Sequence, residues 1–155
     1  MKTALIAALF ASLALAGCGS VTAGIDFKAP AGWSATPSIL GRMQIWTKKA
    51  ADNKDVDMLM LVRGSSNNID LKSIPQAGVG AITTEKQSTI TICGDRKAQF
   101  YSGSASGHSG QKQTMEMVAA TVGSDGYIAM YIHPQAEAAD PEAETAIRSL
   151  CPVKS

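Results

Sequence analysis

The sequence predicts a single α+β domain, in which a series of antiparallel strands is followed by a closing helix, behind an N-terminal export segment. From Lys86 onward, stretches of alternating apolar and polar residues are separated by glycine-containing turns, a pattern typical of β-hairpins. Near the C-terminus, Asp140-Pro141-Glu142 is a typical helix start. An uncharged apolar run close to Met1 predicts the export segment.

The N-terminal segment has the layout of a secretory signal peptide. Lys2 is followed by the apolar run 4–16, which at about a dozen residues is shorter than the roughly 20 that a membrane-spanning helix needs. The block Leu15-Ala16-Gly17-Cys18 resembles the bacterial lipobox, in which the cysteine thiol receives a diacylglyceryl group and its new amine is then acylated, commonly with palmitate. We therefore expect residues 1–17 to be removed, residues 18–25 to form the lipidated cysteine (Cys18) and tether, and residues 26–155 to form the domain.

The composition and the residues after Cys18 limit where the protein can lie and what class of partner it can bind. Two or more acyl chains make a stable membrane anchor, and Gly19 and Ser20 after the cysteine favour the periplasmic face of the outer membrane in a diderm host. The formal net charge of the whole chain is +1, so removal of Lys2 leaves a neutral domain without a basic patch, which argues against a nucleic-acid partner. An apolar fraction of 45% is typical of a folded globule.

The cysteine count predicts one disulfide. Once Cys18 carries lipid, Cys93 and Cys151 remain, and in an exported protein this pair is expected to be oxidised. The bond would close a loop of about 58 residues, worth about 4 kcal/mol in the chain-entropy model. The alternative, a metal site of these cysteines with His108 and His133, lacks the close spacings typical of zinc ligands.

The strands follow from alternation and from the turn residues between them. The stretch Val56–Arg63 is apolar on both faces through its middle and is expected to be central in the sheet. The stretch 70–83 is ambiguous, because Ser73 and Pro75 could begin a helix while the two glycines at 78 and 80 disfavour one. The strands expected in chain order are a short one within Asp26–Trp33, then Arg42–Lys48, Val56–Arg63, Gln87–Cys93, Arg96–Ala105, Lys112–Val122 and Tyr127–His133.

The closing helix is predicted from its first turn and from its apolar face. Asp140 is the expected N-cap, followed by proline at the first helical position and by acidic residues that suit the positive end of the helix dipole. Ala143, Ile147, Leu150 and Cys151 share one face at helical spacing. A bond from Cys151 to Cys93 would therefore join the packing face of this helix to the sheet.

Three short motifs resemble those of Mog1/PsbP-like domains. The stretch FKAPAGW, 27–33, is similar to the F-x-x-P-x-G-W opening of these domains, and ICGDRKA at 92–98 and DPEAETAIRSLC at 140–151 are similar to their second half. The resemblance covers residues 25–153 and implies an antiparallel sheet flanked by helices. It also implies a largely non-catalytic role in binding other proteins. No binding residue of the family matches a position of this chain.

One serine motif invites comparison with hydrolases. GHSGQ, 107–111, resembles the G-x-S-x-G nucleophile elbow, but Gln111 replaces the last glycine and the flanking residues do not form the required strand and helix. The better interpretation of Ser109 and His108 is a polar hairpin loop. We therefore predict no catalytic residue, and composition suggests no cofactor.

The methionines support a second alternative. Met58 and Met60, and likewise Met115 and Met117, are spaced to share one face of a strand, and thioethers are soft ligands for Cu(I). Methionine also fills irregular cores, and both pairs are expected on the strand face that points away from the charged residues of the same strand. Core packing is therefore the preferred interpretation, and no metal site is predicted. Trp33 and Trp46 are similarly expected to pack at the sheet.

These observations predict a lipid-anchored, non-catalytic envelope protein that binds an unidentified envelope protein. The alternatives are a carrier for a small apolar ligand or for Cu(I), and a hydrolase, which the sequence favours least. The layout of anchor, short tether and exposed hairpin loops suits the presentation of a surface to another protein.

Overall fold

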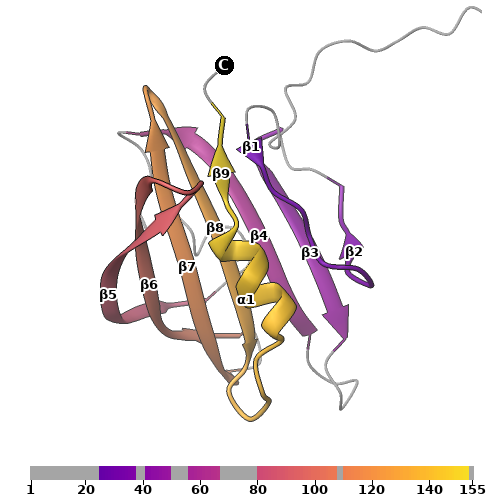
Figure 1. Cartoon of the computed structure of the whole chain (residues 1–155). Helices are drawn as coiled ribbons and strands as arrows, with labels where there is room; N and C mark the ends of the chain where they lie inside the picture. Colours follow the sequence, from indigo (N-terminus) through magenta and orange to yellow (C-terminus); the bar gives the residue numbers. More distant parts are fainter. Residues whose placement is uncertain (1–24, 38–40, 50–55, 67–79, 108–109, 154–155) are drawn as a thin grey trace, which may run out of the picture.

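A computed structural model describes residues 25–37, 41–49, 56–66, 80–107 and 110–153 (Figure 1). The expected lipidation site Cys18, most of the ambiguous stretch 70–83, and the loop residues His108 and Ser109 lie outside these ranges. The last two residues of the ambiguous stretch, Ile82 and Thr83, belong to a strand.

A seven-stranded antiparallel sheet dominates the structure, and a separate pair of short strands joins the two ends of the domain (Figure 1). The order in the large sheet is β2-β3-β4-β8-β7-β6-β5, and the small sheet pairs β1 with β9. The strands are β1 (Ile25–Asp26), β2 (Ser34–Ala35), β3 (Met43–Lys49), β4 (Val56–Ser65), β5 (Ile82–Ile92), β6 (Arg96–Ser106), β7 (Lys112–Val122), β8 (Asp125–Pro134) and β9 (Cys151–Pro152).

The antiparallel arrangement and most of the expected strands are confirmed. The strand Val56–Arg63 lies inside the sheet between β3 and β8, with Leu59 and Leu61 buried on one face and Met60 on the other. The strand expected within 26–33 is shorter than predicted: β1 ends at Asp26, because its partner β9 is only two residues long and pairs with Ile25 and Asp26 alone.

The expectation of a sheet flanked by helices is not supported by the described residues. They contain one helix, α1 (Pro141–Arg148), which lies across β8 and β7 on one face (Figure 1). Its buried Ala143 and Ile147 pack with the apolar residues that the sheet presents on this face. A second apolar cluster lies on the opposite face of the sheet.

A bulge in β5 allows one strand to contribute to both clusters. The register shifts between Thr84 and Lys86, so the side chains after the bulge point to the face opposite to the one that simple alternation predicts. Ile82 accordingly packs in the cluster on the face away from α1, whereas Ile90 and Ile92 pack on the helix side, although all three positions are even-numbered. Sequence alternation alone would have placed them on one face.

Helix α1 ends earlier than predicted. The N-cap at Asp140 and proline at the first turn are confirmed, but the last helical residue is Arg148, and Cys151 lies in β9 rather than on the helix. The physical reason is that Pro152 disfavours helical geometry in the residue before it, while pairing with β1 favours an extended chain there. Leu150 remains buried against the sheet as expected.

The predicted disulfide is present. Cys93 and Cys151 are bonded, with their Cα atoms 5.3 Å apart and a sequence separation of 58. Cys93 lies in the turn between β5 and β6 and has a φ of 53°. The bond therefore ties the turn of this hairpin to β9, instead of to the helix itself.

Candidate functional site

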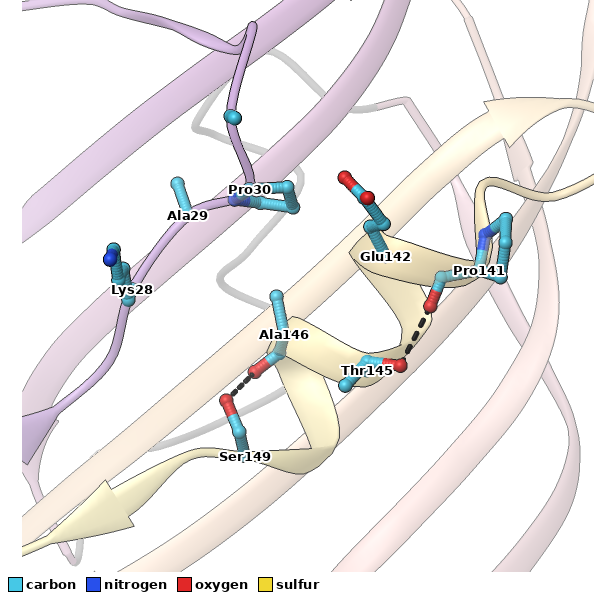
Figure 2. A pocket seen from close by; sticks show the side chains of 9 residues that line it. Lys28, Ala29, Pro30, Pro141, Glu142, Thr145, Ala146 and Ser149 are labelled. Carbon is cyan, nitrogen blue, oxygen red and sulfur yellow. Dashed lines mark hydrogen bonds between the residues drawn. The ribbon is translucent and has the colours of Figure 1, made fainter.

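A groove of about 570 Å³ lies between the segment that follows β1 and helix α1 (Figure 2). One wall is the segment 28–31, and the other is the side of α1 that faces this segment. In Figure 2, Lys28 lies toward the C-terminal end of the helix and Pro30 toward its N-terminal end. The helix wall consists of Pro141, Glu142, Thr145, Ala146 and Ser149.

Aromatic residues on both sides of the segment 28–31 hold it against the sheet. Phe27 packs on Trp46 with ring centroids 5.4 Å apart, and Trp33 and Tyr131 form a T-shaped pair with ring centroids 6.1 Å apart. Phe27 and both tryptophans are partly buried against the helix-side cluster, so the expectation that the tryptophans pack at the sheet is confirmed. The aromatic residues at both ends of the FKAPAGW motif thus hold its central residues where they form one wall of the groove.

Strand pairing connects the two walls. β1 leads directly into the segment 28–31, and β9 follows α1 after two residues, so the pairing of β1 with β9 brings both walls together. Ile25 lies opposite Pro152, and Asp26 opposite Cys151. The guanidinium of Arg96, on β6, donates a hydrogen bond to the Pro152 carbonyl, and the disulfide adds a covalent link to the same strand. The spacing of the walls is therefore set by contacts remote in sequence.

The groove offers an apolar surface between two opposite charges. The hydroxyl of Thr145 donates to the Pro141 carbonyl at 2.8 Å, and that of Ser149 donates to the Ala146 carbonyl at 2.7 Å, so both protons are used within the helix (Figure 2). Alanine and proline supply most of the remaining surface. Lys28 contributes a positive charge on one wall and Glu142 a negative charge on the other.

A partly buried polar network holds the start of α1 on the sheet. The Asp140 backbone N–H donates to the Tyr131 hydroxyl at 2.9 Å, and that hydroxyl donates to Asp57 Oδ2 at 3.3 Å. The Asp140 carboxylate accepts from the Glu142 N–H at 2.9 Å and forms an ion pair of 2.7 Å with Lys48 Nζ. Strands β3, β4 and β8 are thus each linked to the N-terminus of the helix that forms one groove wall.

The two carboxylates of this network differ in their electrostatics. Burial raises the pKa of Asp57 above its ordinary value of 3.8, and the nearby Glu137 and Asp140 add to this, against the opposing effects of His133 and the Tyr131 hydrogen bond. Burial also acts to raise the pKa of Asp140, but the hydrogen bonds from Lys48 and from the helix N-terminus outweigh it and lower that pKa.

Among the described residues, three buried polar atoms on the helix side have no hydrogen-bond partner in that part of the chain: Trp33 Nε1, Asp57 Oδ1 and Glu116 Oε2. Glu116 Oε2 nevertheless lies 3.7 Å from the Arg148 guanidinium. Burial raises the pKa of Glu116, while Arg148 opposes that rise. Such atoms are commonly satisfied by ordered water.

His133 is placed as a packing residue. Its ring stacks on Tyr131 with centroids 5.1 Å apart, and Nδ1 lies 3.0 Å from the carbonyl of the adjacent Pro134. The nearby acid Asp57 is engaged with the Tyr131 hydroxyl instead. The network of Asp57, Tyr131 and Asp140 was not predicted, and its one signal in the sequence is an aspartate inside the otherwise apolar strand VDMLML.

The structure brings the four methionines singled out from the sequence onto one face of the sheet. Met60, Met115 and Met117 are fully buried there and Met58 is partly buried. Met130, which lies alone in the sequence of β8, joins them. Within the described ranges, no three side chains among histidine, cysteine, aspartate and glutamate are grouped so that they could hold a metal ion.

None of the helices in the described part of the chain is both long enough and apolar enough to cross a bilayer.

Comparison with known proteins supports the fold and no more. No family model matches the chain, and no curated protein matches it. The resemblance to Mog1/PsbP-like domains therefore stays a prediction. A protein of Bacteroides thetaiotaomicron shares the fold, with a TM-score of 0.55 and 14% identity over 89% of this chain. The chain spans about half, 48%, of that protein's length.

Two further solved structures are more distant. LpqN of Mycobacterium tuberculosis, described as involved in cell envelope biogenesis, is 18% identical, with a TM-score of 0.47 and 83% of each chain covered. A Pseudomonas aeruginosa protein of unknown function, described as a putative regulator, is 13% identical over 61% of this chain and 69% of its own, with a TM-score of 0.45. At these TM-scores neither structure supports an assignment.

Proposed function

We propose that this protein is a lipid-anchored, non-catalytic accessory module of the bacterial cell envelope, and that it binds another envelope protein in the groove between the segment 28–31 and α1. The groove is the observation that carries the proposal. Its walls are joined by β1–β9 pairing and backed by the disulfide, so the surface is pre-organised, and pre-organisation lowers the entropic cost of binding.

The chemistry of the two walls determines what kind of segment the groove can bind. Because the two wall hydroxyls already donate within the helix, they offer no proton to a ligand, and the charged groups of Lys28 and Glu142 are the main polar contacts in the groove. Helix α1 has eight residues and is about 12 Å long, a length that matches three to four residues of an extended chain at about 3.3 Å each. We expect an extended segment with small apolar side chains, whose acidic residue meets Lys28 and whose basic residue meets Glu142.

In-cell photocrosslinking tests the proposal. A photoreactive amino acid at Thr145, on the groove wall, should yield one defined protein adduct in the native envelope. The same amino acid at Thr121, an exposed position on β7 that does not line the groove, should not. His108→Ala and Ser109→Ala should leave the adduct unchanged, because the proposed role uses no nucleophile. Equal adducts from both crosslinker positions would rule out the groove as the contact.

The anchor is tested separately. Cys18→Ala should remove the lipid, so that the protein is released from the membrane fraction or stays unprocessed, because a folded domain without acyl chains lacks the anchor. Fractionation and intact mass measure both effects. Unchanged membrane association, together with no acyl mass on wild-type Cys18, would contradict lipid anchoring without bearing on the groove.

A further inference from the structure

All six methionines of the described residues lie on one face of the large sheet. They belong to the apolar cluster opposite α1, whereas the larger helix-side cluster contains leucine, isoleucine, valine, alanine and aromatic residues but no methionine. Methionine that only fills irregular gaps would be expected in both clusters. The restriction of methionine to this face points to a role for its thioether sulfur atoms beyond packing.

Three of these methionines stand in a continuous row across adjacent strands. In the register of the sheet, Met60 of β4 lies opposite Met130 of β8, and Met130 lies opposite Met117 of β7. Side chains directly opposite each other on antiparallel strands have Cβ atoms about 4.5 to 5.5 Å apart. Each thioether is carried on a flexible side chain, so the outer two can converge on the central one. All three are fully buried.

The neighbouring row shows why this one is distinct. Met58 and Met115 are also on β4 and β7, but Ile132 of β8 lies between them. Met130 is therefore the residue that joins the two strand pairs into a set of three sulfur donors. It could not be recognised from the sequence, because its strand contains no second methionine at a two-residue spacing.

We propose that Met60, Met117 and Met130 form a binding site for a soft monovalent metal ion, Cu(I), with three thioether ligands. Thioethers select Cu(I) over hard cations, and the apolar surroundings disfavour dications more strongly, since the cost of desolvating an ion rises steeply with its charge. Thioethers also remain available in an oxidising compartment, whereas Cys93 and Cys151 are consumed in the disulfide. Met58, partly exposed on the same face and two residues from Met60, offers a further thioether beside this row.

Competition with a chromogenic Cu(I) chelator tests the site on the full chain in detergent, with ascorbate to keep the copper as Cu(I) while the Cys93–Cys151 disulfide stays oxidised. We expect the wild type to withdraw about one equivalent of Cu(I), and Met130→Leu, which conserves volume, to bind at least tenfold more weakly. Met43→Leu is the matched control, because Met43 is in the same cluster but lies opposite Val62. It should change the affinity less than twofold.

A second measurement does not depend on any variant. Ag(I), a redox-inert monovalent probe, should shift the ε-methyl carbon resonances of Met60, Met117 and Met130 in the wild type. No withdrawal of Cu(I) from the chelator, equal losses in Met130→Leu and Met43→Leu, or silver shifts confined to other methionines would each overturn the proposal. X-ray absorption showing nitrogen or oxygen ligands on the bound copper would do the same.

Discussion

Asp57 is the residue whose surroundings are most unusual for its type. It is 8% exposed, one carboxylate oxygen accepts from the Tyr131 hydroxyl, and the other has no hydrogen-bond partner among the described residues. Since its pKa is raised in the folded state, the folded protein binds more protons than the unfolded chain at pH values above 3.8 and up to the raised pKa. Stability is therefore lost as the pH rises through this window.

The variant Asp57→Asn tests this electrostatic cost. The amide can still accept from Tyr131 and carries no charge, so we expect the loss of stability as the pH rises above 3.8 to shrink. At pH 7 the variant should be as stable as the wild type or more stable by about 1 kcal/mol. Chemical denaturation across this pH range measures both effects, with Asp95→Asn in an exposed turn as the control. Parallel pH curves for wild type and Asp57→Asn would refute the assignment.

Asp140, in the same network, has the opposite effect on how stability depends on pH. Its folded-state pKa is lowered, so its contribution to stability is present above pH 3.8 and is lost as the pH falls through the lowered value. The two residues show which side-chain roles can be predicted from the sequence and which cannot. The capping role of Asp140 could be predicted because it depends on neighbours in sequence, whereas the burial of Asp57 depends on a tyrosine 74 residues away.

Elements were predictable where local pattern determines them. The strand Lys112–Val122 was predicted with its observed bounds, because polar loop residues precede it and a glycine turn follows it. The end of α1, the brevity of β1 and the change of face within β5 were not. Each depends on the tertiary fold: the pairing of β1 with β9, and a bulge that an alternating sequence does not reveal.

The bulge in β5 coincides with a close approach of two backbones. A Cβ atom at Gly103 on β6 would lie 2.0 Å from the carbonyl oxygen of Thr83, so glycine is required where β5 crosses this point. The sequence shows the glycine, but it does not show that the backbone of Thr83 lies against it.

Removing the disulfide should test how β9 is held. Cys93→Ser or Cys151→Ser should lower the free energy of unfolding by about 2 to 5 kcal/mol, because the cross-link closes a 58-residue separation in the unfolded chain. Because β9 supports the groove, each variant should also weaken partner capture at temperatures where it remains folded. Denaturant titration and crosslinking from Thr145 measure these effects. Unchanged stability in both variants would show that strand pairing alone holds β9.

At the scale of the whole molecule, the groove is assembled from both ends of the domain. One wall follows the first described strand and the other precedes the last, and they meet only because Ile25 pairs with Pro152. The sequence predicted each wall separately, as a proline-glycine segment and as a helix start. Their juxtaposition required the topology of the complete sheet, which is why the binding surface was not predicted.

The most direct test of protein binding in this groove is the affinity of the crosslinked partner for the purified full chain after one wall residue is enlarged. Thr145→Arg places a long charged side chain over the apolar surface and should weaken binding at least tenfold, which corresponds to about 1.4 kcal/mol. Thr121→Arg makes the same chemical change at an exposed position outside the groove and should alter the affinity less than twofold. Equal affinities for both variants, with folding intact, would contradict the account.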